Sequence, residues 1–102
     1  MTAKTLKDIM PPTEELLQME PEEIGPFILE YLNHQEEKGS SGQLNRYNFA
    51  LDSNLIEYAG EKVREVGKVL TEGWMWLERE GFIAPKPGEQ GEWVFITRKG
   101  KK

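Results

Sequence analysis

The chain has 102 residues, 37% of them hydrophobic and 30% charged, with no cysteine and a formal net charge of −5 at pH 7. This length suits one compact domain, and the composition is typical of a globular protein with a small core. The lack of cysteine excludes disulfides, thiolate metal sites and cysteine nucleophiles, and it fits a reducing, cytoplasmic location. The chain has no apolar run of about 18 residues that could span a membrane, and its first ten residues lack the apolar region of a secretory signal.

Charge is distributed unevenly along the sequence. Residues 1–60 carry four basic and eleven acidic side chains, whereas residues 61–102 carry nine basic and seven acidic ones. A polyanion would therefore be repelled by the first part of the chain and attracted only weakly by the second.

The N-terminal residues predict short helices. One loose turn is expected between Thr5 and Met10, before a pair of prolines. Thr13 is expected to cap a short helix over residues 14–19, whose first turn carries two glutamates. We interpret residues 1–20 as an N-terminal extension and residues 21–102 as the domain proper.

A longer helix is predicted next, from apolar residues spaced three and four apart that extend to Lys38-Gly39. Pro26 cannot donate a backbone hydrogen bond, so we expect the regular part of this helix to start between residues 23 and 26. Residues 39–42, with two glycines and two serines, predict a mobile loop.

The middle of the chain predicts a strand and then a brief helix. Tyr47, Phe49 and Leu51 alternate with other residues, which favours a short strand with one buried face. Asp52 or Ser53 is expected to cap a helix over residues 54–59, with Leu55, Ile56 and Ala59 inward and Gly60 ending it in a left-handed conformation.

The strongest helical pattern covers residues 61–80. When successive residues are rotated by 100°, Leu70 and four other apolar side chains within about 40° of it form one stripe of five residues. They are Val63, Val66, Leu70, Trp74 and Leu77. Gly67 and Gly73 flank this stripe, and their lack of a side chain would let another element approach closely. Gly81 is expected to close the helix.

A hairpin is predicted to end the chain, with strands near residues 82–84 and 93–97 joined by a loop that holds two prolines and two glycines. The complete order is then helix, strand, short helix, long helix and hairpin. This order predicts an α+β winged helix-turn-helix fold, preceded by an N-terminal helical extension.

Residues 77–83 (LEREGFI) and 94–100 (VFITRKG) resemble the end of winged-helix domains in bacterial regulators. Those domains show a leucine, then Gly-Leu-Ile, a loop, and a strand that ends in Leu-Thr-x-x-Gly. Here Phe82 and Ile96 replace two of the leucines. Over about residues 48–99 the chain is also similar to the winged-helix segment of a group of uncharacterised bacterial proteins, in which residues like 72–81 (EGWMWLEREG) precede a Pro-Gly loop. The resemblance implies the fold and does not specify a function.

Catalytic motifs are absent from the sequence. His34 is the only histidine, and no partner at motif spacing would make it a general base, so we interpret it as a surface residue. Adjacent glutamates such as Glu36-Glu37 point about 100° apart on a helix and do not converge as a catalytic pair. The hairpin loop lacks the pattern of a phosphate-binding loop. We therefore expect no enzyme activity, no cofactor and no metal.

Double-stranded DNA is narrowly the favoured partner, because the long helix of a winged helix enters the major groove. The outer arc of residues 61–80 carries three positive and three negative charges, which weakens this prediction. The candidate helix contacts are Arg64, Lys68 and Arg79, and the candidate phosphate contacts are Lys86, Arg98 and Lys99.

The alternative is a module for protein–protein interaction or self-association. Val69, Met75 and Trp76 are then the candidate surface, since aromatic residues and methionine are enriched at interfaces. Trp76 is also explained by burial beneath the N-terminal helix or beneath Trp93 of the second hairpin strand, and Trp74 is expected to be core.

The end of the sequence carries a further expectation. A threonine at the end of such a strand often caps another helix, and the five residues after Thr97 are too few to form one that is stable. We therefore expect the chain to be one module of a longer protein.

Overall fold

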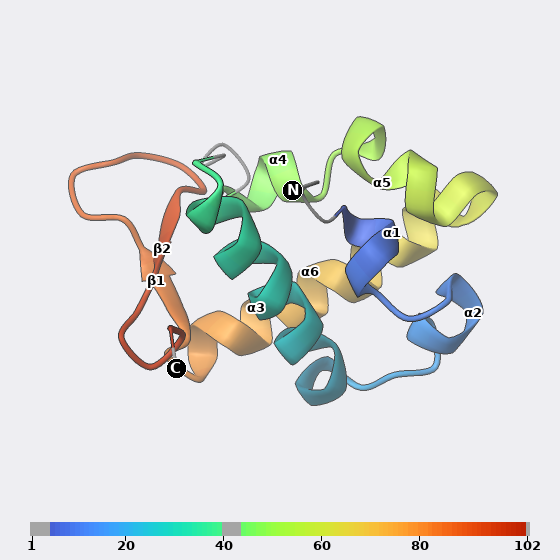
Figure 1. The fold of residues 1–102 in the computed structure, drawn as a ribbon, viewed down its shortest axis with the longest axis horizontal. Helices are drawn as coiled ribbons and strands as arrows, with labels where there is room; N and C mark the ends of the chain where they lie inside the picture. Colours follow the sequence, from blue (N-terminus) through green and yellow to red (C-terminus); the bar gives the residue numbers. More distant parts are fainter. Residues whose placement is uncertain (1–4, 40–43, 102) are drawn as a thin grey trace.

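Figure 1 shows the computed structural model of the chain, which describes residues 5–39 and 44–101. The fold is α+β, mainly helical with one two-stranded antiparallel sheet, in agreement with the predicted class. The helices are α1 (Leu6–Ile9), α2 (Thr13–Leu16), α3 (Pro21–Glu37), α4 (Arg46–Phe49), α5 (Asp52–Ala59), the 3-10 turn η2 (Gly60–Lys62) and α6 (Val63–Arg79). The strands are β1 (Ile83–Pro85) and β2 (Val94–Ile96). Residues 40–42 of the predicted mobile loop lie outside the described residues.

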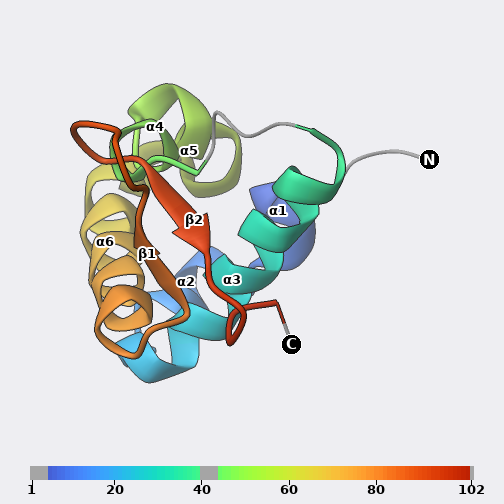
Figure 2. The same cartoon turned by 90° about the vertical axis from the view of Figure 1, so that its left-hand side faces the viewer.

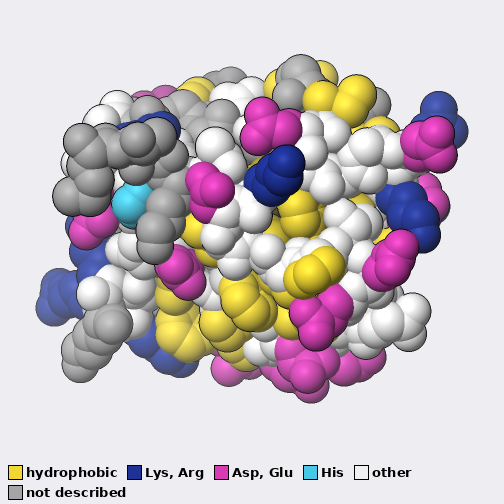
Figure 3. Space-filling view, turned by 45° about the vertical axis from the view of Figure 1, so that its right-hand side comes forward, with side chains coloured by type: hydrophobic (Ala, Val, Ile, Leu, Met, Phe, Trp, Pro, Cys, Tyr) yellow, Lys and Arg dark blue, Asp and Glu magenta, His cyan; other side chains and the backbone are white. Residues whose placement is uncertain are grey.

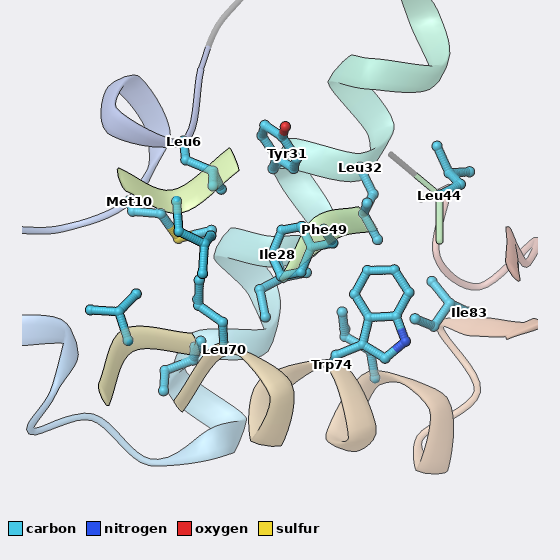
Figure 4. Packing of buried hydrophobic residues seen from close by; sticks show 14 of the residues in the cluster. Leu6, Met10, Ile28, Tyr31, Leu32, Leu44, Phe49, Leu70, Trp74 and Ile83 are labelled. Carbon is cyan, nitrogen blue, oxygen red and sulfur yellow. The ribbon is translucent and has the colours of Figure 1, made fainter. Parts of the chain in front are cut away.

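The core is built where α3 crosses α6 (Figure 1). Gly73 of α6 lies against Ile24 and Ile28 of α3, and a Cβ atom at this position would come within 2.8 Å of both side chains. The close approach predicted for this glycine is therefore confirmed. Figure 4 shows the indole of Trp74 beside Ile28 and Phe49, and the Trp74 and Phe49 ring centroids are 5.2 Å apart.

The predicted apolar stripe of the long helix is confirmed. Val66, Leu70, Trp74 and Leu77 are buried, and Val63 is partly buried at the first residue of α6. The regular helix begins two residues later than predicted because residues 60–62 form a 3-10 turn. Gly81 follows the helix with a φ of 81°, a conformation that glycine adopts without strain.

The first 20 residues contribute to the same core as the rest of the chain. Leu6, Met10 and Leu16 are buried in it. Thr13 is the first residue of α2 and not its cap, which corrects the prediction. Its hydroxyl donates to the carbonyl oxygen of Tyr58 in α5 at 3.1 Å, so a tertiary contact takes the side chain that the local sequence suggested for capping.

The start of α3 also differs from the prediction, because the helix begins at Pro21 and includes Pro26. Pro21 is favourable at the first helical position, and the backbone N–H of Glu20 donates to the Glu23 carboxylate at 2.8 Å. Pro26 leaves the carbonyl of Glu22 without its helical donor. Both residues are exposed, so water can replace that hydrogen bond.

The strand predicted from Tyr47, Phe49 and Leu51 is wrong, because residues 46–49 form helix α4. The Asn45 side chain accepts a hydrogen bond from the Asn48 N–H at 3.0 Å and caps this helix. Phe49 is buried while Tyr47 is 65% exposed, so the alternation does not reflect the two faces of a strand.

The extended segment lies just before α4 instead. Asn45 forms an antiparallel bridge with Trp93. The N–H of Arg46 donates to the carbonyl of Glu92, and the N–H of Val94 donates to the carbonyl of Leu44, both at 3.0 Å. A short third segment therefore pairs with the edge of the hairpin.

Helix α5 starts at Asp52 with Leu51 as its N-cap, two residues before the predicted start. Leu55 and Ala59 are buried as predicted, but Ile56 is 58% exposed. The two buried residues are one helical turn apart, and Ile56 is rotated by about 100° away from Leu55. Gly60 has a positive φ of 56°, but its ψ of −125° lies outside the left-handed helical region, so the predicted conformation is wrong.

The predicted hairpin is confirmed, with Ile83 paired to Ile96, Ala84 to Phe95 and Pro85 to Val94. After β2 the chain makes a turn held by Thr97, whose hydroxyl donates to the Gly81 carbonyl at 2.6 Å and accepts from the Gly100 N–H at 3.2 Å. A Cβ atom on Gly100 would overlap the carbonyl oxygen of Phe82. The Thr-x-x-Gly spacing thus joins the chain after β2 to the end of α6.

The core assignment predicts a large effect of Leu77→Ala. Leu77 is fully buried, so its truncation should lower the free energy of unfolding by about 2–5 kcal/mol. Met75→Ala is the matched control, because Met75 lies on the same helix and is 58% exposed. Urea denaturation of both variants measures the difference. A loss below about 0.5 kcal/mol for Leu77→Ala, the size of an ordinary surface effect, would contradict this core.

Candidate nucleic-acid interface

A shallow groove of about 640 Å³ follows the side of α6 next to Ala50, the residue after α4. Its lining consists of Ala50, Val63, Arg64, Gly67, Lys68, Thr71 and Glu72. We call this surface the α6 groove. Two cationic side chains, a hydroxyl and a carboxylate here border a partly apolar floor, a mixture that can contact both phosphates and base edges.

On the exposed arc of α6, the cations Arg64 and Lys68 lie on one side and the carboxylates Glu65 and Glu72 on the other. At 100° per residue, Arg64, Lys68, Thr71 and Met75 fall within a sector of about 60°. Arg79 lies about 20° outside one edge of this sector and Glu78 about 20° outside the other. Glu65 and Glu72 follow beyond Arg79. The sector therefore holds only cations among its charged residues, although the whole arc sums to zero. Glu72 borders this sector and still lines the groove.

Arg64, Lys68 and Arg79 are all exposed. Within residues 5–39 and 44–101, Arg46 pairs with Glu92 and Lys101 pairs with Glu36, and His34 lies 4.0 Å from Glu37. The cations of α6 are in none of these pairs. Their charges thus remain directed to solvent, where a phosphate could approach.

The six predicted DNA contacts do not share one surface. Arg64, Lys68 and Arg79 lie on α6, and exposed Lys86 begins the hairpin loop directly after β1. Arg98 and Lys99 follow β2, at the opposite end of the hairpin from that loop (Figure 2). This placement separates them from Lys86 and from the α6 groove.

Lys99 already has a structural role. Its Nζ donates to the carbonyl oxygen of Glu80 at the end of α6, at 2.7 Å, and lies 4.5 Å from the centroid of the Phe82 ring. Cations are favourable at a helix C-terminus, so this lysine stabilises the connection between α6 and β1.

A charged cluster lies between α6 and the hairpin, and no pattern in the sequence predicts it. The guanidinium of Arg46 donates from Nε to Glu92 Oε2 at 2.7 Å. This hydrogen bond lowers the pKa of the Glu92 carboxyl and raises the pKa of Arg46. Burial raises the pKa of Glu78, with Arg46 acting against the rise and Glu92 adding to it.

The three residues predicted as a protein-interaction surface do not lie on one surface either. Met75 is 58% exposed and lies in the cationic sector. Val69 and Trp76 are partly buried and rotated by about 100° or more from it. Trp76 stacks on Phe82 with ring centroids 5.6 Å apart and lies against Gly25 of α3. It is therefore partly buried beneath Phe82 and α3, where the prediction named the N-terminal helix or Trp93.

The N-terminal part of the chain packs directly against α6, through α2, α3 and α5. Figure 3 shows the face on which α1, α2 and α5 come forward, and Asp and Glu side chains gather along its lower edge. Because α5 packs against α6 and Ala50 lines the α6 groove, the repulsion expected from residues 1–60 also reaches this groove.

His34 lies partly buried on α3, with Nδ1 at 4.0 Å from a Glu37 carboxylate oxygen. Among the described residues, no group of three or more His, Asp or Glu side chains could hold a metal ion. The described helices also include none that is long and apolar enough to cross a membrane.

Sequence reasoning missed Thr71 and Ala50, which line the groove beside the predicted cations. The position of Thr71 on the same side of the helix as Arg64 and Lys68 follows from helical periodicity alone. The position of Ala50 beside the groove could be known only from the path of the chain after α4.

Comparison with models of protein families, with curated proteins and with solved structures found no match.

The charged cluster predicts opposite pH effects of two substitutions. Glu78 has a raised pKa when folded, so it opposes folding at neutral pH, and stability should rise as pH falls toward that pKa. Glu92 has a lowered pKa, so its stabilisation is present above the ordinary value of 4.5 and is lost as pH falls through the folded pKa. Glu78→Gln should thus equal or exceed the wild type in stability at neutral pH, whereas Glu92→Gln should be less stable there.

Thermal unfolding monitored by circular dichroism, from about pH 7 to about pH 3, measures both effects. Each variant should converge on the wild type once the carboxyl it lacks is protonated. A neutral-pH loss of stability for Glu78→Gln as large as that for Glu92→Gln would contradict the assignment.

Proposed function

We propose that the chain is a winged helix-turn-helix module that binds double-stranded DNA and has no catalytic chemistry of its own. The element order supports this: α3, the paired segment at residues 44–46, α5, α6 and the hairpin. In this interpretation α6 is the recognition helix and residues 86–93 form the wing. The chemistry is hydrogen bonding and charge neutralisation, without covalent steps.

The cationic sector of α6 is the observation that carries the proposal. Arg64 and Lys68 project from the α6 groove with no ion pair within the described residues, and either can donate to phosphate oxygens or to guanine O6 and N7. Met75 lies in the same sector and is 58% exposed, which suits an apolar contact with a thymine methyl group. Lys86 on the wing would add one phosphate contact.

The placement of the cations limits the strength of binding. Arg98 and Lys99 lie at the end of the hairpin away from Lys86, beside the end of α6. This leaves Arg64, Lys68 and Lys86 as possible phosphate contacts, with Arg79 at the margin of the groove. With three or four phosphates neutralised, the log–log dependence of affinity on salt should have a slope of about −3 to −4. Non-specific binding near 0.15 M salt should be no tighter than about 10⁻⁵ M.

Fluorescence anisotropy with a labelled random duplex tests this proposal between about 20 and 200 mM salt. Lys68→Glu, alone or combined with Arg64→Glu, should abolish measurable binding, because each replaces an attraction with a repulsion. Arg98→Glu is the matched control, since it makes the same charge change at the distant end of the hairpin. It should change the dissociation constant by less than about threefold at 0.15 M salt, where charges beyond about 8 Å are screened.

Equal losses in Lys68→Glu and Arg98→Glu would contradict the α6 groove as the binding surface. No binding by the wild type at the lowest salt would exclude the DNA proposal. The second candidate, protein interaction or self-association, is favoured by large apolar side chains that are more than half exposed: Met75 on α6, Tyr47 on α4 and Ile56 on α5. Its test is whether Met75→Glu abolishes concentration-dependent association in sedimentation.

A further inference from the structure

A buried hydrogen-bond donor lies at the junction of α6 and the hairpin. The side chain of Trp74 is fully buried, and its Nε1 is the one buried side-chain nitrogen or oxygen of the described residues without a hydrogen-bond partner. In Figure 4 this nitrogen lies on the side of the indole that faces Ile83 of β1. Buried Trp N–H groups normally have an acceptor, and leaving one unpaired is unfavourable.

Trp74 borders a small cavity of about 30 Å³ between α6 and the hairpin. The cavity is also lined by Glu78 of α6, by Pro85 and Val94 of the two strands, and by residues 91–93 of the hairpin loop. A bound water needs roughly 10–15 Å³ of such space and two to four polar partners. The cavity therefore has room for one or two water molecules and none for a larger ligand.

The lining groups define the chemistry of the occupant. The Trp74 N–H requires an acceptor, which a metal ion or an ammonium ion cannot provide. The carboxylates of Glu78 and Glu92 require donors and would repel an anion. A neutral molecule of minimal size that both donates and accepts satisfies all three groups, and water has these properties.

We propose that this cavity binds an ordered water molecule that accepts a hydrogen bond from Trp74 Nε1 and donates one to the carboxylate of Glu78. Its second hydrogen is directed toward Glu92, whose Oε2 already accepts from Arg46. The water links the centre of the helical core to the hairpin loop through Arg46 and Glu92. It therefore holds the hairpin at a defined angle to α6, whether or not the chain binds DNA.

The test uses the indole N–H resonances of the folded, full-length chain. The chain has three tryptophans, so Trp76 and Trp93 serve as internal comparisons in one spectrum. A rotating-frame NOE experiment should show a dipolar cross-peak between the Trp74 Hε1 proton and the water resonance, opposite in sign to an exchange peak. The Trp74 Hε1 proton should also exchange with solvent more slowly than that of Trp93, since Trp74 is fully buried and Trp93 only partly so.

Glu78→Met removes the acceptor and retains a side chain of similar length. It should reduce the Trp74–water cross-peak at least threefold and shift the Hε1 resonance. Glu72→Met makes the same change on an exposed position of α6 and should alter neither. A Trp74 Hε1 proton with cross-peaks to Glu78 side-chain protons and none to water would overturn the proposal in favour of a direct hydrogen bond. An unchanged water cross-peak in Glu78→Met would overturn Glu78 as the acceptor.

Discussion

The contact between α6 and α3 at Gly73 sets the arrangement of the other elements. Because Gly73 has no side chain, Ile24 and Ile28 of α3 reach the backbone of α6, and Trp74 lies beside them under Phe49. Helices packed this closely bury one apolar face of each partner. The short helices α1, α2 and α5 then cover the remaining core, and the hairpin follows from the end of α6. A larger residue at this position would separate the two longest helices.

Burial of one face of α6 also determines what the opposite face can do. The apolar stripe is directed to α3, so the cationic sector is directed to solvent beside α4. Glu65 and Glu72 fall on the neighbouring side, toward Trp76 and Val69. A net-neutral helix can thus present a locally positive surface. The proposed DNA contact depends on this division of charge, since the total charge of the chain opposes it.

The hairpin is held to the helical core by polar contacts at two places. At one end, the Thr97 hydroxyl donates to the carbonyl of Gly81, and Lys99 donates to the carbonyl of Glu80. Both carbonyls lie just after the last residue of α6. At the other end, Arg46 binds Glu92, and the inferred water would join that pair to Trp74. These contacts involve residues far apart in the sequence. Together they fix the position of the hairpin loop relative to α6, on which contact with a DNA backbone would depend.

Local pattern alone was sufficient for the long helix, its buried stripe, the hairpin and the close approach at Gly73, because periodicity and glycine act within one element. It failed at Tyr47 and Phe49, where alternation suggested a strand but the Asn45 cap and the burial of Phe49 favour a helix. From the sequence, Arg64 and Lys68 were candidate helix contacts with DNA and Lys99 was a candidate phosphate contact. Only the tertiary structure separated Lys99, bound to the Glu80 carbonyl, from the cations of the α6 groove, since the path of the hairpin places it there.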